Sequence, residues 1–125
     1  MTLDLMVLPG VLAVCRLPAG SPVPEWVSGD VLVSITQTTD EVSVVCDASA
    51  VPEGVAAEYG WRAIRVVGPL DFSLTGVLAS LAAPLASAGV PIFALSTFDT
   101  DYVLVKESAL AEALAALAST GHRIG

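Results

Sequence analysis

The chain consists of short apolar runs separated by polar, proline or glycine residues, and most of the runs have the length of a β-strand. Alternating apolar and polar positions with many valines are typical of strands that bury one face. Pro9 and Gly10 form a turn signal between the first two runs. The pattern therefore predicts strands at residues 3–8, 11–17, 31–36, 42–46, 61–67, 91–96 and 101–106.

Apolar residues at helical spacing predict an amphipathic helix over residues 74–88. We expect Asp71 or Ser73 to cap its N-terminus, because a side-chain oxygen can accept from the free N–H groups there. Gly89 is expected to end the helix. Pro84 removes one hydrogen bond within the helix and is expected to bend it. The apolar stripe consists of Leu74, Val77, Leu78, Leu81 and Leu85.

A second amphipathic helix is predicted over residues 108–118, with Ser108 as its cap, and a short last strand follows at 122–124. Residues 18–29 are rich in proline, glycine and serine and are expected to form a loop. A short helix is expected at 52–58. The first 60 residues are therefore expected to lack a long helix.

The predicted order from Trp61 onward is strand, helix, strand, strand, helix, strand. This is the ferredoxin-like (βαββαβ) arrangement, an α+β fold in which an antiparallel sheet carries both helices on one face. Apolar residues make up 54 % of the 125 residues, and the mean hydropathy is +0.77. Because small domains keep a large share of their surface exposed, we expect a second copy to cover apolar surface in a homodimer.

The two halves of the chain contain a weak internal repeat. A shift of 61 residues aligns residues 35–45 with residues 96–106 and gives five identical positions in eleven, which include Asp40 and Asp101. Threonine and valine are common in strands, so chance is the alternative explanation. If the repeat is genuine, residues 1–60 form a degenerate unit and residues 61–125 a complete one.

The net charge of −8 comes from five basic and thirteen acidic residues. An acidic chain repels phosphate backbones, so we expect no binding of nucleic acid. No apolar run reaches the roughly 18–20 residues that a membrane span needs, so we expect no membrane insertion. The N-terminus lacks the basic residues of a secretory signal, and we expect a cytoplasmic protein.

Cys15 and Cys46 lie within apolar strands and are expected to be buried free thiols, with a disulfide or a nucleophile as the alternatives. His122 is the only histidine, and no cluster has the spacing of metal ligands. Asp99 and Asp101 are candidate paired carboxylates of an enzyme, but no third partner for a nucleophile accompanies them. We therefore expect no catalytic residue, no metal and no cofactor.

Several motifs between residues 65 and 105 occur together in one known family. They are Gly68-Pro69-Leu70 and Phe72 after a strand, Gly76 in the following helix, Ala88-Gly89-Val90 before the next strand, and Ser96-Thr97-Phe98 with Asp101. In this combination the segment resembles the ACT domain. It is most similar to the small tandem-ACT branch, which includes free-standing bacterial amino-acid-binding proteins and the animal cytosolic arginine sensors. The resemblance is strong over residues 61–118 and weaker over residues 1–60.

This resemblance implies two pseudo-repeated ACT-like units and a regulatory role without catalysis. Proteins of this branch bind a free amino acid at the junction of ACT units. They hold it with the loop between the second and third strands of the last unit and with the turn after its first strand. A sensor also reports to a downstream protein, which the sequence does not identify. The implied ligand-binding residues are Leu70, Phe72, Ser73, Leu74, Thr97, Phe98, Thr100 and Asp101.

The chemistry of a free amino acid suits these residues. Asp101 begins a strand, and its carboxylate is expected to face the ligand's ammonium. The hydroxyls of Thr97 and Thr100 can donate or accept, and N–H groups of the turn 69–73 are expected to face the ligand's carboxylate. Phe98 is expected to cover the ligand's apolar stem.

Simpler roles compete with each of these assignments. Asp101 can cap the turn 97–100, and Phe98 can belong to the core. The first-half equivalents are Gln37, Thr38 and Asp40, and Gln37 in place of Phe98 puts a second site in doubt. A ligand-free dimerisation module is the alternative function, and it should fill the space between the turn 69–73 and the loop 97–101 with side chains. Asp71 and Asp99 favour a cationic ligand side chain, whereas Phe72 and Phe98 favour an aromatic or aliphatic one.

Overall fold

A computed structural model describes all residues from 1 to 125. The chain forms two compact units. Residues 1–8 and 62–125 make up the helical unit, and residues 9–61 make up the strand unit. The expected division after residue 60 therefore misplaces the N-terminal strand, because residues 1–8 belong to the same unit as residues 62–125.

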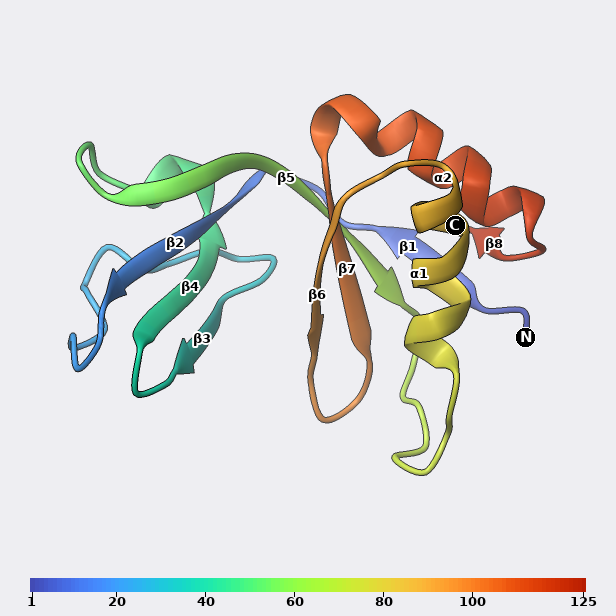
Figure 1. Cartoon of the computed structure of the whole chain (residues 1–125), viewed down its shortest axis with the longest axis horizontal. Helices are drawn as coiled ribbons and strands as arrows, with labels where there is room; N and C mark the ends of the chain where they lie inside the picture. The colour runs from blue at the N-terminus through green and yellow to red at the C-terminus, as the bar shows by residue number, and fades with distance from the viewer. The chain divides into compact units, whose positions relative to one another are not determined.

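The helical unit is built on a five-stranded sheet in the order β8-β1-β5-β7-β6 (Figure 1). Strand β1 pairs antiparallel with β5 and parallel with β8, and β6 pairs antiparallel with β7. The expected βαββαβ order is present from β5 onward, and β1 is added between its first and last strands. The strands are β1 (Asp4–Val7), β5 (Ala56–Val66, from Arg62 onward in this unit), β6 (Ile92–Ser96), β7 (Asp101–Lys106) and β8 (Arg123–Ile124).

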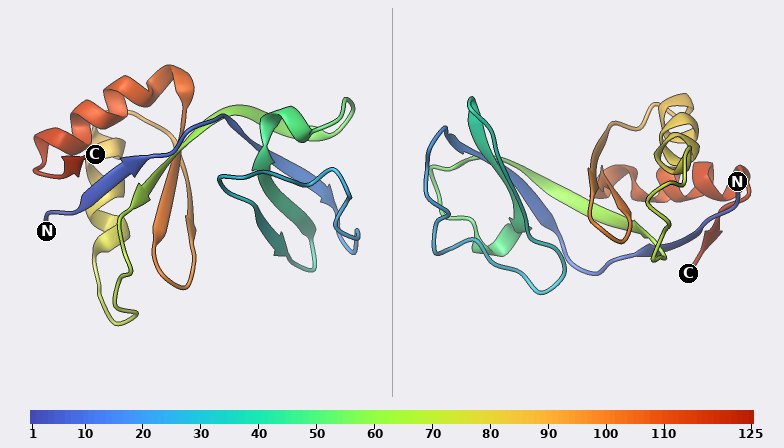
Figure 2. Two further views of the ribbon diagram at one scale, coloured as in Figure 1. Left: turned by 180° about the vertical axis from the view of Figure 1, so that it is seen from behind. Right: turned by 90° about the horizontal axis from the view of Figure 1, so that it is seen from below.

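Two helices, α1 (Val77–Ser87) and α2 (Leu110–Ser119), cover one face of this sheet (Figure 2). Their buried side chains share one apolar core with alternate residues of the strands. The sheet side chains that face the helices include Leu5, Ile64, Val66, Val103 and Val105, and the helices contribute Val77, Leu81, Leu85, Ala113 and Leu117. The α+β, ferredoxin-like prediction is confirmed.

Helix α1 begins three residues later than the sequence pattern predicts. Its N-cap is Gly76, whose φ of 81° is left-handed, a conformation that side-chain-bearing residues avoid. Asp71 and Ser73 do not cap it, because no side chain bonds to the first turn. Ser108 does not cap α2 either, since the 3-10 turn Glu107–Ala109 precedes that helix and Ala109 is its N-cap. Gly89, with a φ of 72°, follows α1 as expected.

Pro84 lies inside α1 and has no N–H to donate to the carbonyl of Ser80. That carbonyl instead lies 3.0 Å from Nε2 of His122. The other ring nitrogen, Nδ1, accepts from the backbone N–H of Leu3 at 3.1 Å. His122 is only 5 % exposed, and its imidazole is a buried link between the N-terminal segment and α1.

The strand unit is an antiparallel sheet in the order β3-β4-β2-β5, and it contains no α-helix. Trp26 and Val27, from the proline-rich loop, pack against its apolar core. The short helix expected at 52–58 is absent, because a 3-10 turn (Ala48–Ala50) comes earlier and β5 already begins at Ala56. The other strands are β2 (Leu12–Pro18), β3 (Ser34–Gln37) and β4 (Glu41–Asp47).

Cys15 and Cys46 are free and buried in the core of the strand unit. Burial raises the pKa of the Cys15 thiol to about 11. The thiol is therefore protonated at neutral pH, and a protonated thiol is a poor nucleophile.

Neither α1 nor α2 has the length and apolar content needed to cross a bilayer.

The hairpins β3–β4 and β6–β7 share a four-residue loop, but the structure aligns them with a shift of 59 residues. The flanking pair is Gln37 and Val42 in one hairpin and Ser96 and Asp101 in the other. The expected shift of 61 is therefore wrong by two residues. Side chains along a strand point to the same face at every second residue. An error of two residues therefore still aligns valines with valines. Val42, not Asp40, is the counterpart of Asp101, and Gln37 matches Ser96 rather than Phe98.

Candidate functional site

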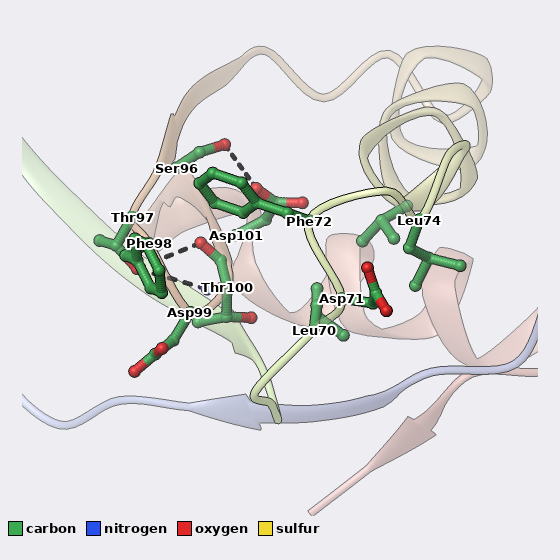
Figure 3. Close-up of a pocket in the computed structure, with 11 residues that line it drawn as sticks. Leu70, Asp71, Phe72, Leu74, Ser96, Thr97, Phe98, Asp99, Thr100 and Asp101 are labelled. Atoms are coloured by element: carbon green, nitrogen blue, oxygen red, sulfur yellow. Dashed lines mark hydrogen bonds between the residues drawn. The ribbon is translucent and has the colours of Figure 1, made fainter.

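Two segments of the helical unit surround an open cavity of about 160 Å³ (Figure 3). One is the segment between β5 and α1, and the other is the loop between β6 and β7. Ser73 lies beside the cavity without lining it, whereas the other seven expected binding residues all line it. The lining consists of Leu70, Asp71, Phe72, Leu74, Val77, Ser96, Thr97, Phe98, Asp99, Thr100 and Asp101.

Phe72 and Phe98 form an aromatic pair at this cavity. Their ring centroids lie 4.9 Å apart at an angle of 39°, a geometry that is favourable for aromatic side chains. The two side chains are 79 % and 80 % exposed. The alternative that Phe98 belongs to the core is therefore wrong. Two phenylalanines that expose this much apolar surface at a cavity can cover an apolar part of a ligand.

Asp101 is the carboxylate at the base of the β6–β7 loop. It begins β7 and pairs directly with Ser96, the last residue of β6. The Ser96 hydroxyl donates to Oδ1 of Asp101 (Figure 3), and this bond fixes the carboxylate at the cavity. Ser96 is not among the expected binding residues, although the two residues that flank a four-residue hairpin loop face one another.

The threonine hydroxyls of the loop are used within the chain. Oγ1 of the buried Thr100 donates to the carbonyl of Val66 at 2.6 Å. Oγ1 of Thr97 donates to the carbonyl of Thr100 at 3.2 Å, and the N–H of Thr97 donates to the same carbonyl at 2.8 Å. Both residues line the cavity as expected. The Thr100 hydroxyl holds the loop on the end of β5, whereas the Thr97 hydroxyl closes the loop on itself.

The segment before α1 is fixed against the loop by its backbone. The N–H of Leu70 donates to the carbonyl of Asp99 at 2.7 Å. Gly68 lies beside this bond, and a Cβ there would come within 3.1 Å of both Asp99 O and Leu70 N. Glycine at position 68 therefore permits the close approach of the two segments that form the cavity.

Two of the four N–H groups in the turn 69–73, those of Leu70 and Ser73, already have partners. Besides Leu70, the N–H of Ser73 donates to Oδ1 of Asp71 at 2.9 Å and that of Leu74 donates to the carbonyl of Asp71 at 3.0 Å. Because α1 starts at Val77, the free N–H groups of the helix belong to its first turn. Val77 lines the cavity, so this turn offers further N–H donors beside those of the segment 69–73.

Asp71 organises the turn that carries Phe72. The backbone N–H and the hydroxyl of Ser73 both donate to Oδ1 of Asp71, and they lower the pKa of that carboxyl below its ordinary value. Because this pKa is lowered, the charged carboxylate stabilises the folded protein at a pH above the ordinary aspartate pKa of about 3.9. This stabilisation is lost as the pH falls through the pKa of Asp71 in the folded protein.

We therefore expect the pKa of Asp71, measured by NMR titration of its side-chain carboxyl, to lie below that of an unstructured aspartate. Replacing Ser73 with alanine removes the hydroxyl donor and should move this pKa back toward the ordinary value. Replacing Phe72, whose side chain does not bond to the carboxyl, serves as the control. An unchanged pKa in the Ser73→Ala variant would show that the hydroxyl does not stabilise the charged carboxylate.

A family model for the ACT domain matches residues 56–119, just over half of the chain, and a model for an N-terminal domain matches residues 10–54. The chain therefore belongs to the ACT domain family.

A human protein, the cytosolic arginine sensor for mTORC1 subunit 1, is 38 % identical over 58 residues. This match covers 46 % of the present chain and 18 % of the sensor, so the chain spans under a fifth of this relative. A solved protein from Agobacterium tumefaciens is 37 % identical, with a TM-score of 0.94 over all of this chain and 93 % of that one. The regulatory subunit of aspartate kinase from Thermus flavus shares the fold, with a TM-score of 0.66 at 12 % identity over 96 % of this chain and 99 % of that one.

Proposed function

We propose that this protein is a regulatory sensor that binds a free amino acid in the cavity between the segment 70–77 and the loop 96–101. The observation that carries the proposal is an open cavity that combines a fixed carboxylate, Asp101, with an exposed aromatic pair. A ligand-free dimerisation module would fill this space with side chains. The membership in the ACT family and the similarity to an arginine sensor support the same function.

The ligand's two backbone charges find opposite partners in this arrangement. The ammonium lies against Asp101, whose Oδ1 is held by Ser96 while Oδ2 accepts from the ligand. The carboxylate lies toward the free N–H groups of the first turn of α1, where the helix dipole favours an anion. Phe72 and Phe98 cover the ligand's stem. The ligand's side chain faces two kinds of group. The carboxylates of Asp71 and Asp99 favour a cationic side chain, whereas the aromatic pair favours an aromatic or aliphatic one. A screen of all amino acids distinguishes these classes.

The role is regulatory rather than catalytic. Both ring nitrogens of the only histidine are engaged with backbone groups, so His122 is not a free base. A homodimer fits the exposed apolar side chains of the helical unit, which include Met1 and Ile124. The similarity to a cytosolic sensor supports a location in the cytoplasm. The sensor would report its occupancy to a protein partner of its own.

A thermal-unfolding screen against all twenty amino acids tests this function. A bound amino acid stabilises the folded protein by RT ln(1 + [L]/Kd), about 2.7 kcal/mol at 100-fold saturation. We expect one amino-acid class to raise the melting temperature. The Asp101→Ala variant should lose the effect, because a charge-assisted hydrogen bond contributes about 1.5–3 kcal/mol.

The Asp40→Ala variant is the matched control, since Asp40 lies in the corresponding loop of the strand unit. It should keep the full response. If the wild-type protein melts cooperatively and no amino acid shifts its melting temperature, the sensor function is wrong and the dimerisation module replaces it.

A further inference from the structure

A second cavity lies on the other side of the β6–β7 loop, and it has a volume of about 280 Å³. Ile64, Val66 and Val103 face the helices, and side chains alternate along a strand. Arg65, Val67 and Tyr102 therefore face the opposite side of the sheet, where they line this cavity. Thr97, Asp99 and Thr100 contribute to both cavities and separate them.

Arg65 is the unusual residue of this second cavity. Its side chain is half-buried, and its guanidinium has no carboxylate within ion-pair distance. One nitrogen, Nη2, donates to Sδ of Met6 at 3.5 Å, and a thioether is a weak acceptor. A guanidinium offers five N–H donors in a planar fork that matches a carboxylate. In a chain with only five basic residues, a guanidinium that faces a cavity without such a partner indicates an anion-binding position.

Asp99 determines which kind of anion fits. Its carboxylate lines the same cavity, and Figure 3 shows it turned away from Asp101 and from the first cavity's aromatic pair. No ion pair joins Asp99 to Arg65. A multiply charged anion such as phosphate is repelled by this carboxylate, whereas a ligand that carries both charges satisfies the two side chains together.

We propose that the second cavity binds a small zwitterion, with its carboxylate on the Arg65 guanidinium and its ammonium on the Asp99 carboxylate. The hydroxyl of Tyr102 and the apolar surfaces of Val67 and Pro69 complete the lining. This site is distinct from the cavity of the proposed sensor, because Arg65 and Tyr102 belong only to the second lining. Because Asp99 and the two threonines form the shared wall, a ligand in one cavity changes the surroundings of the other.

The proposal is tested by titrating ¹⁵N-labelled full-length protein with glycine, acetate, methylammonium and inorganic phosphate at constant ionic strength. Glycine is expected to shift the backbone amide signals of Val67 and Tyr102 at a lower concentration than acetate or methylammonium. The Arg65→Gln variant should bind glycine at this site about tenfold more weakly or worse, because it loses a charge-assisted contact. Asp99→Asn should reduce the glycine response to that of acetate.

Different backbone amide signals report binding in the two cavities. Responses at Phe72 and Leu74 report the first cavity and should disappear in Asp101→Ala, whereas those at Val67 and Tyr102 should persist in that variant. Arg16→Gln, which removes a cation from a strand of the other unit, is the control and should leave all responses unchanged.

Four results would overturn the proposal. One is the absence of glycine-dependent shifts at Val67 and Tyr102, and another is the same shifts in the Arg65→Gln variant. Equal responses to phosphate and glycine would show general attraction of anions to Arg65 rather than recognition of a zwitterion. Shifts that follow protein concentration instead of glycine would show that a second copy covers this face, and they would also contradict the proposal.

Discussion

Replacement of His122 by alanine is expected to lower the free energy of unfolding by about 2–4 kcal/mol, because two backbone groups lose their partners. These groups are the N–H of Leu3 and the carbonyl of Ser80, which lie 3.1 Å and 3.0 Å from the ring nitrogens. Each unsatisfied buried polar group costs about 1–3 kcal/mol. Urea unfolding followed by circular dichroism measures the loss.

A double-mutant cycle with Pro84 isolates the bond to Ser80. Replacing Pro84 with alanine returns an N–H to the helix, and this N–H can donate to the carbonyl of Ser80 four residues earlier. His122→Ala should therefore cost about 0.5–1.5 kcal/mol less in the Pro84→Ala background than in the wild-type protein. Strictly additive effects would show that His122 does not replace the hydrogen bond that proline removes.

Truncation of Leu85 to alanine is expected to cost about 2–5 kcal/mol, because the cavity that remains in a close-packed core cannot collapse completely. Leu85 lies in α1, is fully buried and belongs to the apolar core beneath the two helices. It does not line either cavity, so its loss should lower stability without removing the ligand response of the protein that stays folded. Thermal and urea unfolding measure the change.

Leu78 is the matched control on the same helix. It belongs to the same stripe in the sequence but is 39 % exposed in the structure. The same truncation there should therefore change the free energy of unfolding by less than about 0.5 kcal/mol. A large loss in Leu78→Ala would indicate that another surface, such as a second copy, covers this face of α1.

The two leucines also show how far the sequence can predict burial. Helical spacing placed five apolar residues on one stripe, and Val77, Leu81 and Leu85 are indeed buried. Leu74 and Leu78 are 45 % and 39 % exposed, because α1 begins only after Gly76 and the sheet meets a narrower face of the helix. Periodicity predicts a face but not its width, which depends on what packs against it.

The candidate site was predictable to a similar extent. The ACT motifs predicted that the loop 97–101 and the segment 70–74 meet, and the structure brings seven of the eight expected residues around one cavity. The roles of their polar groups were not predictable. Thr100 bonds to Val66, and the N–H of Leu70 bonds to Asp99. These partners are distant in the sequence or depend on backbone geometry, so no local pattern indicates them.

The sequence by itself determined the order of strands and helices from β5 onward, the burial of both cysteines and the position of the polar loop between β6 and β7. These features follow from local periodicity, which encodes which side of an element faces the core. Only the tertiary structure decided that β1 inserts between β5 and β8 and that His122 bonds to Leu3, 119 residues earlier in the chain. It also decided the register of the hairpins, since a shift of two residues leaves the alternating pattern unchanged. Such contacts depend on the packing of distant segments, which local spacing does not specify.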